Sequence, residues 1–87
     1  MPPTAISDTP EKQLLERIVV NPEVMVGQPV IKGTRLTVQF ILNLLANDIP
    51  FEKITEEYEG ITKQDILACL SFAARVVGNT SLWHQSG

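Results

Sequence analysis

The chain has few of the residues on which catalytic and metal sites are usually built. Its 87 residues include one cysteine, Cys69, and one histidine, His84. A single cysteine excludes an internal disulfide, and one cysteine with one histidine cannot make a cysteine–histidine metal site. The sequence also lacks a serine–histidine–acid set and a cluster of metal ligands. We therefore expect a protein that is not an enzyme and that uses no cofactor, no metal and no small-molecule substrate.

Signals for export and membrane insertion are missing as well. The N-terminus, MPPT, has neither the basic region nor the apolar run of a signal peptide. No apolar stretch reaches the roughly 20 residues that a membrane span needs. We therefore expect a cytoplasmic protein with no membrane segment.

The chain is also short for a domain that folds alone. A chain of this size buries only about 60% of the surface that its unfolded form exposes. Because neither a disulfide nor a metal staples it, its core is marginal, and this favours a partner or a second copy.

Charge is sparse and unevenly placed. The formal net charge is −3. Residues 38–47 carry no charged side chain, whereas residues 48–59 hold five acids against Lys53. Nucleic-acid binders usually show a basic footprint. Here that footprint is small and lies on the loop that holds Lys32 and Arg35.

Turn residues and apolar residues divide the chain into an arm, one domain and a tail. Thr9-Pro10-Glu11 is typical of a helix start, so the arm ends in a short helix at about residues 10–16. β-Branched residues indicate two short strands before the first long helix. The predicted segments are the arm 1–16, the domain 17–77 and the tail 78–87. Within the domain, a β/turn element covers residues 17–37 and holds the two strands, at 17–20 and 30–31. Three helices follow over residues 38–77, at 38–47, 50–59 and 62–77.

The helix over residues 38–47 is apolar around most of its circumference. Thr37 precedes it as the N-cap. Its apolar side chains cover an arc of roughly 240°, which is more than one packing face needs. The second covering surface can come from another copy of the chain, so we expect a homodimer with Phe40 or Leu44 at the contact.

The helix over residues 62–77 has clear start signals. Thr62 is its N-cap, and Asp65, three residues later, makes a weak capping box. The preceding helix, a short turn with Gly60 and this helix together form a helix-turn-helix pattern. Its expected inward stripe is Ile66, Leu70, Ala73 and Val77, and its expected polar strip is Gln64, Ala68, Ser71 and Arg75.

A helix-turn-helix pattern has two interpretations. It can bind duplex DNA, since glutamine and arginine can read base edges and cations meet phosphate. It can equally be a plain three-helix core whose polar residues form a solvated face. The candidate DNA-binding residues are Arg17, Lys32, Arg35, Lys63, Gln64, Ser71 and Arg75.

The most specialised segment is residues 27–38, which read GQPVIKGTRLTV. Together with RIVVNP at 17–22, YEGIT at 58–62 and DILA at 65–68, it resembles the prokaryotic family known as domain of unknown function 433. The resemblance covers about residues 17–77. The loop residues that carry it are Arg17, Pro22, Gly27, Pro29, Ile31, Gly33, Thr34 and Arg35.

The resemblance implies both a fold and a function. The implied fold is mainly α: a homeodomain-like three-helix domain preceded by a short β-element. The implied function is that of an antitoxin in a type II toxin-antitoxin system, which neutralises a PIN-like ribonuclease toxin and also binds its own promoter DNA. The alternatives are a stand-alone helix-turn-helix DNA-binding regulator and a purely structural or interaction domain.

The tail offers a contact for such a toxin. Leu82 and Trp83 are the large apolar residues that follow Gly78, and they lie among small polar neighbours. Tryptophan is enriched among the residues that dominate interface energy. PIN-type active sites are acidic, so the guanidinium of Arg75 is a further candidate. We therefore expect Leu82, Trp83 and Arg75 to bind the partner, although Trp83 can also fold back onto its own domain.

Overall fold

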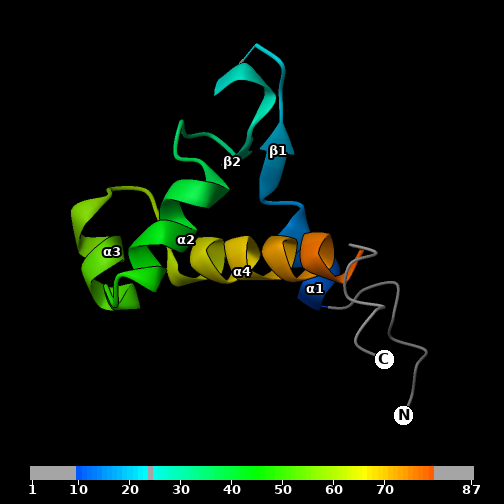
Figure 1. The fold of residues 1–87 in the computed structure, drawn as a ribbon. Helices are drawn as coiled ribbons and strands as arrows, with labels where there is room; N and C mark the ends of the chain where they lie inside the picture. Colours follow the sequence, from blue (N-terminus) through cyan, green and yellow to red (C-terminus); the bar gives the residue numbers. More distant parts are fainter. Residues whose placement is uncertain (1–9, 24, 80–87) are drawn as a thin grey trace.

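The computed structural model describes residues 10–23 and 25–79 (Figure 1). It confirms a mainly helical domain with a short β-element near its N-terminus. The elements are α1 (Pro10–Leu15), β1 (Ile18–Val20), a 3-10 turn η2 (Met25–Gly27), β2 (Pro29–Ile31), α2 (Val38–Ala46), α3 (Phe51–Glu57) and α4 (Lys63–Gly78).

The two strands form an antiparallel hairpin that projects from the layer of helices (Figure 1). Ile18 lies opposite Ile31, and Val20 lies opposite Pro29. Pro29 is tolerated because it stands at the first position of its strand, where a ladder bond is not required. The predicted strands are therefore confirmed with shifts of one residue at their ends.

A tight turn joins the hairpin to α2. Gly33 adopts φ +82°, a left-handed conformation that glycine takes without steric cost. The hydroxyl of Thr34 donates a hydrogen bond to the carbonyl of Ile31 at 2.8 Å and accepts one from the backbone N–H of Leu36 at 3.0 Å. Because Ile31 is buried, the turn is anchored directly to the core.

The helix starts follow the capping residues that the sequence indicates. Thr37 accepts a hydrogen bond from the N–H of Phe40 and begins α2, and Thr62 accepts one from the N–H of Asp65 and begins α4. Pro50 precedes α3 without a side-chain cap. The helix expected at 50–59 is therefore shorter, and it ends at Glu57 because Tyr58 is extended.

The core lies where α2, α3 and α4 meet. Ile41, Ile54, Ile66 and Cys69 are fully buried there, and Ile31 joins them from β2. In Figure 1, α4 forms the long axis of the domain, with α2 and α3 at one end and α1 beside its other end.

Two expectations for α4 are wrong. Leu70 and Val77 were expected to face inward but are 40% and 48% exposed, whereas Ala68, expected on the polar strip, is buried. The reason is that α1, α2, α3 and β1 all contact α4, so its buried surface is not a single stripe. The helix also continues through Gly78 instead of stopping at Val77, and Asn79 is its C-cap.

Candidate binding surfaces

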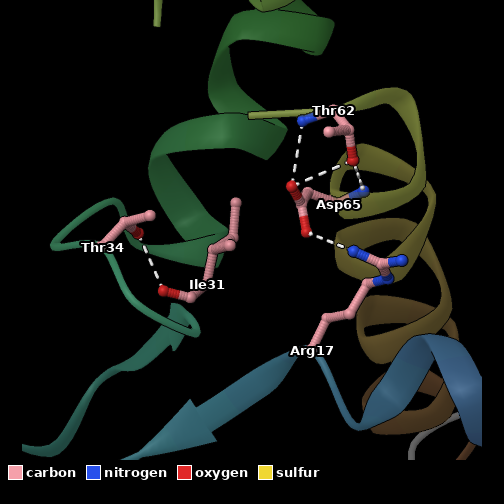
Figure 2. A network of polar contacts seen from close by, with 5 residues as sticks. All are labelled: Arg17, Ile31, Thr34, Thr62 and Asp65. Atoms are coloured by element: carbon pink, nitrogen blue, oxygen red, sulfur yellow. Dashed lines mark hydrogen bonds and ion pairs between the residues drawn. The ribbon is translucent and has the colours of Figure 1, made fainter. Parts of the chain in front are cut away.

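A buried carboxylate links the hairpin to the start of α4 (Figure 2). Asp65 accepts hydrogen bonds from the backbone N–H and the hydroxyl of Thr62, at 2.9 and 3.1 Å, and forms the reciprocal capping box that the sequence predicts. Its other oxygen pairs with the guanidinium of Arg17 at 3.1 Å. The Asp65 side chain is 9% exposed and that of Arg17 44%. The family-motif residue Arg17 therefore has a structural contact as well as an exposed edge.

The candidate DNA-binding cations do not gather in one hollow of the described surface. Arg17 and Lys32 border a hollow that also contains Glu16 and Asp65. Lys63 borders a different hollow, between α3 and α4.

Arg35 borders yet another hollow, together with Phe40. Arg75 pairs with Glu11 at 3.4 Å in an exposed ion pair. The positive charge is thus dispersed and partly neutralised by neighbouring acids.

Helix α1 lies alongside the polar candidates of α4. Gln64 shares a hollow with Gln13 and Leu14 of α1. Near the other end of α4, Arg75 pairs with Glu11 of α1. Gln64, Ser71 and Arg75 are spaced so that they lie along one side of the helix. In this arrangement α1 flanks the face of α4 that would read a DNA groove.

A second surface is almost entirely apolar. A groove of about 320 Å³ runs between β2, α2 and the C-terminal half of α4. Sequence reasoning missed this groove, although the wide apolar arc of α2 was a signal for one of its walls. Its described lining residues are apolar apart from two glutamines: Gln28, Pro29, Val38, Gln39, Leu42, Phe72, Ala73, Val76 and Val77.

The two candidate dimer contacts differ in exposure. Phe40 is 37% exposed, and its ring meets that of Tyr58 edge-on with centroids 5.6 Å apart. Leu44 is half-buried and packs against the core. Of the two, Phe40 is the better placed to contact a second copy. The candidate partner-binding residues Leu82 and Trp83 lie outside the described residues.

The single thiol is buried away from these surfaces. Burial raises the pKa of Cys69 to about 12, and the negative charge of Asp65 adds to the effect. A thiol is reactive as its thiolate, so Cys69 is a core residue here and not a nucleophile.

Residues 10–23 and 25–79 form neither a metal-binding cluster nor a membrane-spanning helix. No group of three or more histidine, cysteine, aspartate or glutamate residues is close enough there to hold a metal ion. No helix in these ranges is long and apolar enough to cross a membrane.

A β-hairpin followed by three helices, with a helix-turn-helix corner between α3 and α4, defines a small, mainly helical domain. Residues 18–73 match the family described as Protein of unknown function (DUF433), and the chain belongs to that family. The family resemblance drawn from the loop motif is therefore confirmed. Helix α1 lies outside the matched residues.

The chain is similar to the crystal structure, at 2.00 Å resolution, of a DUF433 member protein from Anabaena variabilis ATCC 29413. The TM-score is 0.67 at 22% sequence identity, and the alignment covers 86% of this chain and 76% of that one. At this identity the similarity concerns the fold. Among curated proteins, none matches this chain.

Proposed function

We propose that this protein is a non-catalytic binding protein, the antitoxin of a type II toxin-antitoxin system, which holds and neutralises a PIN-like ribonuclease. The observation that carries the proposal is the combination of an apolar groove with exposed apolar side chains. Val20, Val76 and Val77 are about half exposed, and Val26 is 92% exposed. Apolar surface of this kind is typical of a protein-binding face.

The charge distribution supports a protein partner over a nucleic acid. Two of the candidate cations, Arg17 and Arg75, are paired with acids of the same chain. The Arg75 pair is exposed on both sides, so it is weak and can be exchanged for a partner's carboxylate at little cost. Arg75 can thus present its guanidinium fork to the acidic site of a ribonuclease.

Co-purification tests the proposal and the role assigned to the tail. A tagged PIN-like protein encoded beside this gene is expressed with the full chain and with a chain that lacks residues 80–87. The deletion starts after Asn79 because Asn79 caps α4. We expect the full chain to be recovered with the tagged protein and the shortened chain to be recovered less. No recovery of the full chain would contradict the proposal, and equal recovery of both would move the interface to α2 or the loop.

Promoter binding is the second candidate function, favoured by the exposed Lys63 and Gln64 at the start of α4. If α4 meets DNA phosphate, replacing Lys63 and Arg75 with alanine reduces the slope of log affinity against log salt by about 2, close to one unit per contact. Lys53→Ala is the control, because Lys53 lies on acidic α3 and pairs with Glu57. An unchanged slope in the double variant would remove α4 as the phosphate contact.

A further inference from the structure

The apolar groove opens beside the end of α4, where the described chain stops. Its α4 wall consists of Phe72, Ala73, Val76 and Val77. Asn79, two residues beyond Val77, closes the helix through hydrogen bonds from its N–H to the carbonyls of the last turn. The chain therefore leaves α4 at one end of the groove.

We infer that the chain's own C-terminal segment, residues 80–87, occupies this groove in the free protein, with Leu82 and Trp83 as the inserted side chains. An extended chain spans at most about 3.6 Å per residue, so Trp83 can lie up to roughly 14 Å from Asn79. Phe72, at the far end of the α4 wall, precedes Asn79 by about 10 Å of helix. The segment is long enough to turn back along the whole wall.

The chemistry of the segment matches that of the groove. The described residues that line the groove carry no charge. Residues 80–87 contain no aspartate, glutamate, lysine or arginine, and Leu82 and Trp83 are their large apolar residues. Insertion of these two side chains therefore removes apolar surface of both the segment and the groove from water without burying a charge.

The polar groups of the groove also suit a tryptophan. A buried indole N–H usually finds an acceptor. The side-chain carbonyls of Gln28 and Gln39, both groove-lining residues, are acceptors of the required kind.

Tethering favours this occupant over a second copy of the chain. A segment joined by a few residues has an effective concentration in the millimolar range, whereas a second copy is present only at its own concentration. The groove, at about 320 Å³, lies at the lower end of the roughly 300–1,000 Å³ of small-ligand sites, a size that suits one or two side chains.

Tryptophan fluorescence tests the inference directly, because Trp83 is the single tryptophan of the chain. In the full-length protein we expect its emission to be blue-shifted, and its quenching by acrylamide to be slower, than in the urea-unfolded chain. Both properties should stay constant from low to high micromolar concentration. An emission maximum and a quenching rate equal to those of the unfolded chain would overturn the inference.

Two variants on the same helix locate the docking site. Val77→Gln places an amide in the groove and should shift the docked-to-undocked ratio by about tenfold toward the exposed tryptophan. Leu70→Gln is the matched control, because Leu70 has a similar exposure, 40% against 48%, but does not line the groove. Far-ultraviolet circular dichroism checks that both variants keep their helices.

The remaining outcomes separate the other occupants. Protection of Trp83 that Val77→Gln does not reduce would place the tryptophan elsewhere and overturn the inference. Protection of Trp83 that appears only at concentrations at which light scattering reports a dimer would assign the groove to a second copy and overturn the inference as well. Nuclear Overhauser contacts between the Trp83 ring and the methyl groups of Leu42 or Val77 would support it even if a variant failed to fold. The inference concerns the free protein and does not depend on the proposed partner. A partner that binds the groove or Leu82 and Trp83 would displace the segment from the groove.

Discussion

Removal of the Asp65 carboxylate should destabilise the fold more than removal of any exposed charge. Asp65→Ala removes the reciprocal half of the α4 capping box, and with it the three hydrogen bonds that a mostly buried carboxylate accepts from Thr62 and Arg17. The two Thr62 bonds belong to the capping box, whose loss costs about 1 kcal/mol, and the hydrogen bond from the Arg17 guanidinium contributes about 1.5–3 kcal/mol. The Arg17 side chain is 44% exposed, so water compensates in part for its lost contact with Asp65. We expect a loss of about 3 kcal/mol in the free energy of unfolding.

A double-mutant cycle separates the ion pair from the cap. Arg17→Ala leaves the carboxylate bonded to Thr62 and should cost about 1–2 kcal/mol, because a mostly buried charge loses one partner. The coupling energy between Arg17 and Asp65 should be about 1 kcal/mol. The exposed pair Lys53–Glu57 is the matched control, and its coupling should stay below about 0.5 kcal/mol.

Urea unfolding monitored by circular dichroism measures each variant. A loss of 3 kcal/mol is large against the roughly 5–15 kcal/mol that stabilises a typical domain. If the Arg17 and Asp65 effects add within about 0.3 kcal/mol, the two side chains are independent. The Arg17–Asp65 ion pair would then contribute nothing to stability.

Three further predictions concern the thiol, one turn and self-association. Cys69 should resist iodoacetamide at pH 8 in the native protein and react after unfolding in urea. Because folding raises the pKa of the Cys69 thiol from 9.0 to about 12, the contribution of the thiol to stability is complete below pH 9 and is lost as the pH rises toward 12. Asp48, which follows α2 at φ +68°, should tolerate glycine with a gain of about 0.5–1 kcal/mol in urea unfolding, and a loss would show that its side chain is needed. Light scattering at micromolar concentration should report twice the chain mass of 9.6 kDa, and Phe40→Ala should shift that mass toward the monomer, whereas a wild-type monomer would contradict the dimer.

Local signals in the sequence were sufficient for the helix starts and for the turn before α2. Thr37 and Thr62 cap their helices, and Gly33 takes the left-handed conformation, because each of these features depends on residues within three or four positions. The same holds for the reciprocal hydrogen bond of Asp65, which lies three residues after its partner Thr62.

Contacts between distant residues were not predictable in this way. Arg17 and Asp65 are 48 positions apart, and the ion pair forms only because the hairpin packs on α4. The exposure of Leu70 and Val77 follows from how several elements share α4, which helical periodicity does not record. The apolar groove is a surface of three elements, of which only the apolar arc of α2 is evident in the sequence.

Inhibition of ribonuclease activity tests the central claim most directly. Any PIN-like protein that the neighbouring genes encode is assayed on an RNA substrate while the folded, full-length protein is added in increasing amounts. If this chain is the antitoxin, the cleavage rate falls linearly to zero at a fixed molar ratio of the two proteins. A cleavage rate that stays constant at a molar excess of folded protein would contradict the claim.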